Sequence, residues 1–123
     1  MKISLSPLSH TWLIDIDGTI LKHNGYLENN EQLLEGIKEF WIMIPKNDYI
    51  ILLTSRSKSH QKRTIEFLNT NNLRYNQIIF NLPTGERILL NDTKPSGLQT
   101  AIAINLKRNV GLNSNIIEFD ENL

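Results

Sequence analysis

Two aspartates followed by a Gly-Thr pair are the residues of this chain whose types and spacing point most directly to chemistry. An apolar run over 12–14 leads to Asp15 and Asp17 and stops at Gly18-Thr19. Such a run is typical of a buried strand that delivers polar residues to its carboxyl end. Glycine accepts backbone conformations that interrupt a strand, so Gly18 lets both carboxylates turn toward one site.

The two carboxylates have complementary uses in phosphoryl transfer. A carboxylate can attack phosphorus and form an acyl phosphate, which divides one difficult displacement into two easier steps. We predict this nucleophilic role for Asp15. Its partner must give a proton to the leaving oxygen and later take one from water, and such acid/base help is worth roughly 100-fold to 10,000-fold in rate. We predict that role for Asp17.

A second apolar run, over 49–53, also ends in polar residues, Thr54-Ser55-Arg56. Open parallel sheets bind ligands outside the carboxyl ends of their strands, so these residues are expected near the two aspartates. We expect Thr54 to bind a phosphate oxygen through its hydroxyl and backbone N–H, although a Thr in this position can also cap the next helix. Ser55, Arg56 and Gly18 belong to the same predicted phosphate-binding set.

A magnesium ion is expected where two carboxylates meet a phosphate dianion. Mg²⁺ prefers oxygen ligands and usually takes one or two carboxylates together with waters and a phosphate oxygen. Asp15 and Asp17 are predicted metal ligands, and Asp92, after another apolar run, is the predicted third. The alternative for Asp92 is the capping of a turn. Asp120, after the run 116–119, is a weaker acidic candidate.

Alternating strands and helices would carry these residues. The apolar pattern predicts strands over 12–17, 49–53, 77–80 and 87–90, and helices over 33–44 and 59–71. The first helix would begin from an N-cap at Asn29 or Asn30 and end before Pro45. Residues 100–106 fit a helix or a strand of period two, and we predict a fifth strand. This order implies an α/β fold with a mainly parallel sheet.

Composition narrows the class of protein. A chain of 123 residues suits a single domain spanning 1–123, and 40% hydrophobic with 21% charged residues is an ordinary globular mixture. Lys plus Arg equals Asp plus Glu at 13 each, so a nucleic-acid partner is not expected. Cysteine is absent, which excludes thiolate chemistry. No apolar run has the length of a membrane span or secretory core, so we expect a cytoplasmic protein.

The stretch Asp15–Thr19, Asp-Ile-Asp-Gly-Thr, resembles the first motif of the haloacid dehalogenase-like (HAD) superfamily in its phosphatase form. Leu53-Thr54-Ser55 is similar to the second motif and Asn91-Asp92 to the acidic fourth, so the resemblance covers residues 12–106. It implies a Rossmann-like three-layer sandwich, bound magnesium and an aspartyl-phosphate intermediate. No insertion between the motifs is long enough for a cap domain, so the chain resembles capless members.

The chain departs from the superfamily at its third motif, a Lys or Arg that neutralises the phosphate and the nucleophile. No Lys lies between Lys62 and Lys94. The role would fall to Lys94, Arg87 or Arg74. We choose Lys94, because Pro95 fixes the backbone beside the expected strand end.

Loops beside the first two motifs are expected to complete the site. His23 and Arg56 are placed to reach substrate from these loops. Residues 22–26, with Asn24-Gly25 as a tight turn, resemble the small hairpin flap that the superfamily carries after its nucleophile. An open site without a cap implies a bulky substrate, or a neighbouring subunit of a homo-oligomer acting as a lid.

The segment 75–95 looks like small proteins encoded with capsule and lipopolysaccharide sugar enzymes. We therefore expect magnesium-dependent hydrolysis of a small phosphorylated metabolite, in the biosynthesis of capsular or surface polysaccharide precursors. Two alternatives are a phosphatase of nucleic-acid 3' ends, which the zero net charge disfavours, and a binding or regulatory module that keeps the fold without turnover. The pattern leaves the role of residues 107–123 open.

Overall fold

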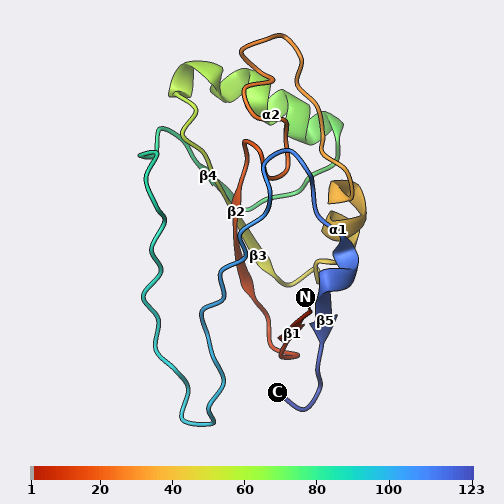
Figure 1. The fold of residues 1–123 in the computed structure, drawn as a ribbon, viewed down its shortest axis with the longest axis vertical. Helices are drawn as coiled ribbons and strands as arrows, with labels where there is room; N and C mark the ends of the chain where they lie inside the picture. Colours follow the sequence, from red (N-terminus) through yellow and green to blue (C-terminus); the bar gives the residue numbers. More distant parts are fainter. Residues whose placement is uncertain (1) are drawn as a thin grey trace.

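A computed structural model describes residues 2–123 and confirms an α/β chain with parallel strands (Figure 1). In chain order the elements are β1 (Ile3–Leu5), β2 (Thr11–Asp15), α1 (Ile37–Met43), β3 (Tyr49–Leu53), the 3₁₀ turn η1 (Lys58–His60), α2 (Gln61–Thr70), β4 (Gln77–Ile79), the 3₁₀ turn η2 (Ser114–Ile116) and β5 (Ile117–Phe119). The strands form two small sheets, and the larger one positions the residues of interest.

The larger sheet has three parallel strands in the order β2-β3-β4. Asp15 pairs with Leu53 and Leu53 with Ile79, so all three strands end at one edge of the sheet. Parallel strands buried by helices are rich in Ile and Leu, as the run from Ile50 to Leu53 is. The predicted strands around 12–17, 49–53 and 77–80 are therefore present, the first ending two residues early and the third one residue early.

One hydrophobic core lies between this sheet and the two helices. Ile50 and Leu52 of β3 are fully buried, as is Leu68 of α2. Phe40 and Trp41 of α1 are also buried, and the Trp41 indole N–H donates to the Arg74 carbonyl at 2.9 Å. Burying a large apolar side chain is worth about 1.5–3 kcal/mol, so this core is the main source of stability for the sheet edge that carries Asp15.

The start of the sheet is braced by Asp48, which is only 3% exposed. Its carboxylate accepts hydrogen bonds from the Trp12 indole at 2.9 Å and from the His10 backbone and ring nitrogens at 3.0 and 2.8 Å. Burial acts to raise the pKa of Asp48, but these hydrogen bonds together outweigh it and lower the pKa. The ionised carboxylate therefore holds the beginning of β2 against the loop before β3.

Helix α1 is shorter than the predicted helix over 33–44. Gly36 stands at its N-cap with a φ of 80°, a left-handed conformation, so the helix begins only at Ile37. A Cβ at Gly36 would overlap the Leu112 carbonyl, so this position requires glycine. The predicted N-caps Asn29 and Asn30 are wrong, because both precede this break. The second predicted helix is present as η1 followed by α2.

The two predicted strands over 87–90 and 100–106 are wrong. Residues 81–106, which we call the arm, run out from β4 and back without regular structure and lie on the left in Figure 1. Ile88 and Leu90 are 83% and 90% exposed. A strand needs a neighbouring edge to take up its backbone groups. Near its tip the arm bonds to itself, where the Lys94 N–H donates to the Leu98 carbonyl at 3.2 Å, and at its base the Leu82 N–H donates to the Thr54 carbonyl at 3.1 Å.

The second sheet pairs β1 with β5 in parallel, Ile3 opposite Ile117. The apolar run before Asp120 forms β5; β1 was not predicted, because its alternation of apolar and polar residues is short. Ser4 Oγ donates to Glu118 at 2.7 Å, and the Asp120 N–H donates to the Leu5 carbonyl at 2.8 Å. The first and last strands of the described chain therefore lie side by side.

Candidate functional site

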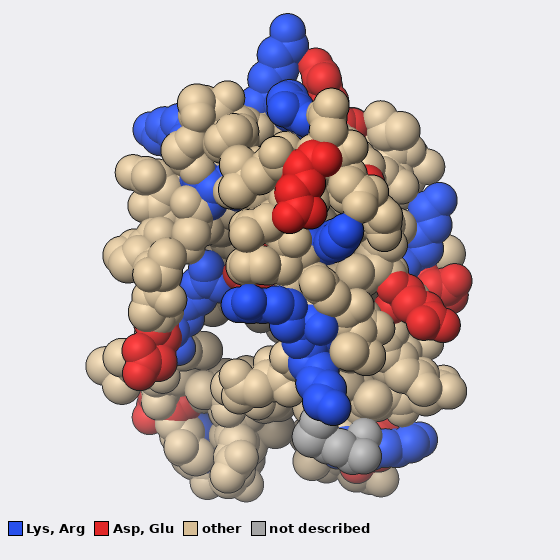
Figure 2. All heavy atoms as spheres, turned by 45° about the horizontal axis from the view of Figure 1, so that its top comes forward, with Lys and Arg blue, Asp and Glu red and all other residues tan. Residues whose placement is uncertain are grey.

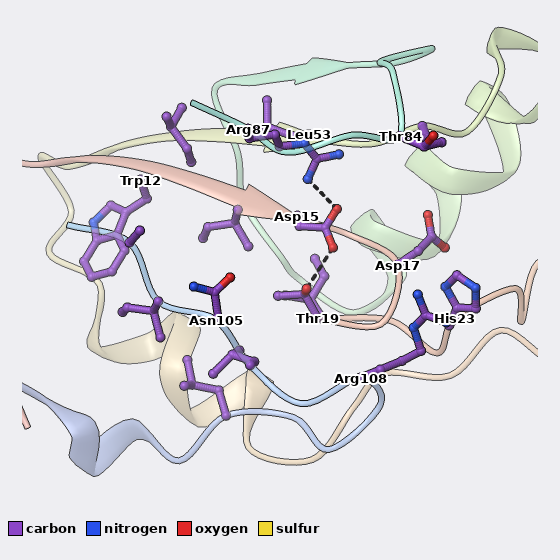
Figure 3. Close-up of a pocket in the computed structure, with 18 of the residues that line it drawn as sticks. Trp12, Asp15, Asp17, Thr19, His23, Leu53, Thr84, Arg87, Asn105 and Arg108 are labelled. Atoms are coloured by element: carbon purple, nitrogen blue, oxygen red, sulfur yellow. Dashed lines mark hydrogen bonds and ion pairs between the residues drawn. The ribbon is translucent and has the colours of Figure 1, made fainter. Parts of the chain in front are cut away.

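A cavity of about 770 Å³ opens at the carboxyl end of β2. Asp15 and Asp17 line it from β2 and the turn that follows, and parts of 84–89 and 102–108 form the opposite walls (Figure 3). Figure 2 shows the molecular surface hollowed between two lobes, with several Lys and Arg side chains at the rim. The structure thus places both Asp15 and Asp17, the predicted nucleophile and acid/base residue, on the wall of one cavity.

The Asp15 carboxylate is held by one neutral and one charged donor. Thr19 Oγ1 donates to one oxygen at 2.8 Å, and Arg87 Nη1 from the arm donates to the other at 2.7 Å. Both side chains of the ion pair are about one third exposed, so the pair is partly screened by solvent. Arg87, one of three residues considered for the third motif, is therefore the cation that contacts the predicted nucleophile.

The other two residues considered for that motif lie elsewhere. Lys94, our first choice, stands in the exposed tip of the arm and does not line the cavity. The Arg74 guanidinium donates to the backbone carbonyls of Pro45 and Asp48 at 2.8 and 3.2 Å. The strand that should have carried Lys94 toward the site is not formed, and Arg87 contacts Asp15 instead.

The Asp17 carboxylate is held by Arg56 and Thr54. Arg56 Nε and Nη2 donate to Asp17 Oδ1 at 3.1 and 2.9 Å, and Thr54 Oγ1 donates to Oδ2 at 3.2 Å. Both Thr54 and Arg56 are buried. Thr54 caps neither helix; its oxygen accepts the Arg56 backbone N–H at 3.0 Å. The predicted phosphate ligands Thr54 and Arg56 therefore bind Asp17 in this structure.

Arg56 is also neutralised by Glu31, which the sequence analysis did not identify. Arg56 Nη1 and Nη2 donate to the two Glu31 oxygens at 2.8 and 2.9 Å, and Nη1 donates to Thr64 Oγ1 at 3.0 Å. All five guanidinium N–H groups are thus engaged. Burial acts to lower the pKa of Arg56, but the bonds to Glu31 and Asp17 outweigh it and raise the pKa.

Tyr26, in the loop after β2, covers the cluster formed by Arg56, Asp17 and Glu31. Its ring centroid lies 4.0 Å from Arg56 Cζ, a cation–π contact. Burial, followed by the nearby Asp17 carboxylate, raises the pKa of the Tyr26 phenol. The predicted flap over 22–26 is a series of turns rather than a strand hairpin, with Asn24 at a φ of 58°. Its role in the structure is to cover the Arg56 guanidinium.

We predict that Glu31→Gln lowers the free energy of unfolding by about 1.5–3 kcal/mol, the worth of hydrogen bonds to a charged group. The amide keeps the shape but has one acceptor and no charge opposite a buried guanidinium. Urea unfolding measures the change. Glu28→Gln, in the same polar segment and exposed, is the control and should change stability by less than about 0.5 kcal/mol. Equal effects of the two variants would contradict a structural role for Glu31.

The remaining predicted residues take different places. Ser55 lines the cavity, is exposed and donates to the Pro83 carbonyl at 3.4 Å, so its hydroxyl remains accessible. Gly18 is buried, has a φ of 82° and donates its N–H to the Leu21 carbonyl at 2.7 Å. His23 lines the cavity. Asp120 does not line it and lies beside β1.

The predicted metal site is assembled only in part. Asp92 lies exposed in the arm, where its backbone carbonyl accepts a hydrogen bond from Thr100, and it does not line the cavity. Within residues 2–123 no group of three or more His, Asp or Glu side chains is placed to hold a metal ion. The strand expected to bring Asp92 to the site is absent, so Asp92 is not a ligand in this arrangement.

Two carboxylates of suitable chemistry remain, Asp15 and Asp17, both lining the cavity and both partly exposed. Mg²⁺ takes one or two carboxylates and completes its octahedron with waters and phosphate oxygens. The donor set therefore fits Mg²⁺, provided that each carboxylate gives up or shares one of its present partners.

Comparison of this chain with known protein families, curated proteins and solved structures finds no match. Among the described residues no helix combines the length and apolar character needed to cross a bilayer.

Proposed function

We propose that this protein is a HAD-like, capless phosphohydrolase that forms an acyl phosphate on Asp15. The observation that carries the proposal is a carboxylate at the end of a parallel strand, facing a cavity of about 770 Å³, with a second carboxylate two residues later and an arginine on its oxygen. Nucleophile, acid/base and cation are the groups that phosphoryl transfer requires.

The two steps follow from these positions. An Asp15 oxygen attacks phosphorus while the bond from phosphorus to the leaving oxygen breaks, and protonated Asp17 gives its proton to that oxygen. Asp17, now ionised, takes a proton from water as the water oxygen attacks the phosphoryl group and releases Asp15. Bound Mg²⁺, held by Asp15 and, once it is ionised, by Asp17, would supply positive charge that lets the Asp15 carboxylate approach the phosphate dianion.

The contacts of Asp17 indicate which of its oxygens takes part. Oδ1 accepts from Arg56 Nη2 and Nε at 2.9 and 3.1 Å, whereas Oδ2 accepts from Thr54 and Arg56 Nε at 3.2 Å each. Longer hydrogen bonds are weaker. We assign the proton transfer to Oδ2, with Oδ1 remaining on Arg56 and fixing the orientation of the carboxyl group.

Arg87 is assigned the charge-neutralising role. We predict that Arg87→Gln lowers kcat/KM by about 10-fold to 100-fold, the loss of one charge-assisted hydrogen bond, because the phosphoryl oxygens lose their cation. Lys94→Gln removes a charge at the exposed tip of the same arm and is the matched control. Its kcat/KM should stay within about twofold of the parent value. Steady-state kinetics with an aryl phosphate measures both, and the opposite ranking would return the role to Lys94.

A second function is favoured by one specific observation. All four oxygens of Asp15 and Asp17 already accept hydrogen bonds from Thr19, Arg87, Arg56 and Thr54. A site in which the carboxylates serve only as partners of arginines would suit a binding or regulatory module without turnover. Such a module would bind phosphate or a phosphorylated ligand and leave it unchanged.

An aryl phosphate assay with added Mg²⁺ and with EDTA separates the two functions. An enzyme should hydrolyse the probe only with Mg²⁺, whereas a binding module should bind inorganic phosphate and hydrolyse nothing. A screen of phosphorylated sugars, amino alcohols and nucleotides then tests the proposed substrate, a phosphorylated precursor of a surface polysaccharide. Hydrolysis at the wild-type rate in EDTA would contradict the magnesium requirement.

A further inference from the structure

Arg108 lines the same cavity and has no part in the proposed chemistry. Figure 3 shows Arg87 reaching Asp15 from one side, while Arg108 and His23 lie on the other side, next to Asp17. Within residues 2–123 the Arg108 guanidinium has no carboxylate partner, in contrast to Arg56 and Arg87. A cation thus faces the cavity with its donors available.

The backbone beside Arg108 is fixed to the loop that follows the aspartates. Asn109 adopts a φ of 65° and donates its N–H to the Gly18 carbonyl at 2.9 Å, and its side-chain oxygen accepts the His23 N–H at 2.8 Å. Asn is among the few residues that accept a left-handed conformation at low cost. These two bonds hold the segment that carries Arg108 against the loop from Gly18 to His23.

The stem of Arg108 lies across Gly18. A Cβ added at Gly18 would stand 3.2 Å from Arg108 Cγ, closer than an ordinary contact. The missing side chain at position 18 therefore leaves the space in which the arginine stem runs toward Asp17. Arginine loses less freedom per hydrogen bond when its stem is already restrained, so this placement favours ligand binding.

The cavity is larger than a phosphate alone requires. Its volume of about 770 Å³ lies within the roughly 300–1,000 Å³ range of pockets that enclose whole small molecules. If the phosphate is at Asp15 and Arg87, the remainder of the ligand extends past Asp17 toward Arg108. A planar guanidinium binds a carboxylate or phosphate through two parallel hydrogen bonds.

We propose that Arg108 binds a second anionic group of the substrate, so that the protein selects phosphomonoesters that also carry a carboxylate or a second phosphate. This inference rests on the proposed function for the position of the first phosphate. The shared chemistry is an anion at the far end of the ligand, and Arg108 is a specificity residue that takes no part in the bond changes.

Matched ligand pairs test the proposal. 6-Phosphogluconate and sorbitol 6-phosphate differ only in a carboxylate against a hydroxymethyl group, and fructose 1,6-bisphosphate and fructose 6-phosphate differ by a second phosphate. Binding is measured by calorimetry on an Asp15→Asn background, in which the proposed nucleophile cannot consume the probe. Turnover of the same probes is measured separately with Asp15 intact. The variants are Arg108→Gln, Arg108→Lys and, as control, Lys107→Gln, whose residue is exposed and does not line the cavity.

We expect the doubly anionic member of at least one pair to bind about 10-fold to 100-fold more tightly, the worth of a charge-assisted hydrogen bond. Arg108→Gln should abolish this preference with little effect on the singly anionic member, Arg108→Lys should keep part of it, and Lys107→Gln should keep all of it. Preference for the carboxylate pair or the bisphosphate pair identifies which anion is bound.

Two results would overturn the inference. One is that the Asp15→Asn protein with Arg108 intact binds both members of each pair equally tightly; the other is that Arg108→Gln weakens the binding of both members of a pair equally. Failure of the proposed function gives a different pattern, since a chain that hydrolyses none of the probes can still show the Arg108-dependent preference in binding.

Discussion

Asp15→Asn is expected to reduce hydrolysis of an aryl phosphate by more than about 10,000-fold, below the detection limit of a standard assay. An amide is a very poor nucleophile toward phosphorus, and it cannot form the acyl phosphate. The amide retains the size of the carboxylate and can still accept from Thr19 or Arg87, which contact Asp15 at 2.8 and 2.7 Å. The fold should therefore survive, and thermal melting checks this.

Asp92→Asn is the matched control for Asp15→Asn. It is the same chemical change on an exposed aspartate of the arm, outside the cavity. We expect its activity, and its dependence on Mg²⁺, to stay within about twofold of the parent. A large loss in Asp92→Asn would show that the arm moves to bring Asp92 to the metal, as the sequence resemblance implies. Residual activity of Asp15→Asn near the parent level would exclude Asp15 as the nucleophile.

Asp17→Asn is expected to slow turnover by about 100-fold to 10,000-fold, while KM changes little. The amide can neither give a proton to the leaving oxygen nor take one from water, although its oxygen can still accept a bond from Arg56, now 2.9 Å from Oδ1. Kinetics on substrates with different leaving groups measures the role. The loss should be largest for alkyl phosphates, whose leaving oxygens most need a proton, and smallest for aryl phosphates with acidic phenols.

Stability must be measured in parallel for Asp17→Asn, because Asp17 is one of two carboxylates that neutralise the buried Arg56. Removing one member of a buried ion pair can cost about 3–5 kcal/mol. Glu31→Gln perturbs the same arginine from the other side and leaves Asp17 in place. If both variants lost activity and stability alike, Asp17 would be a structural residue only; a rate loss confined to Asp17→Asn supports the acid/base role.

The central sheet and the second helix were predictable from sequence because their signals are local. The run 49–53 is apolar throughout and must be buried, and Asp15 follows a run of the same kind, so both strand ends were expected at one edge. The start of α1 was not predictable. The helix begins after Gly36, where the chain packs closely against the Leu112 carbonyl, and Leu112 lies far along the sequence.

The arm shows why an apolar pattern can mislead. Ile88, Leu89 and Leu90 read as a buried strand, yet no sheet edge takes up their backbone groups, so they stand exposed. Burial depends on which edges the rest of the fold leaves available, and a sequence window does not contain that information. Asp92 and Lys94 were assigned to the site through this expected strand, and their assignment fails with it.

For the charged residues of the site, the sequence pattern did not reveal which side chains contact one another or line the cavity. Arg56 follows a strand and was predicted to bind substrate, but it is buried and its guanidinium donates to Glu31 and Asp17. These two carboxylates offset the free-energy cost of burying its charge. Glu31 lies in a polar stretch and Arg108 in Lys107-Arg108-Asn109, where charged residues are normally solvated. Only the spatial arrangement shows that Glu31 binds Arg56 and that Arg108, although exposed, lines the cavity.

The pairing of β1 with β5 has a consequence for the order in which the chain folds. Ser4 and Glu118, whose side chains meet at 2.7 Å, are 114 positions apart, so their contact closes nearly the whole described chain into a loop. The entropy lost in closing a loop grows with the logarithm of its length, and contacts between distant residues form slowly. β2 and β3 are separated by a much shorter connection, so the sheet that carries Asp15 can assemble before the two ends of the chain meet. Closure of the β1–β5 pair is then a late event, built on a core that already holds the site.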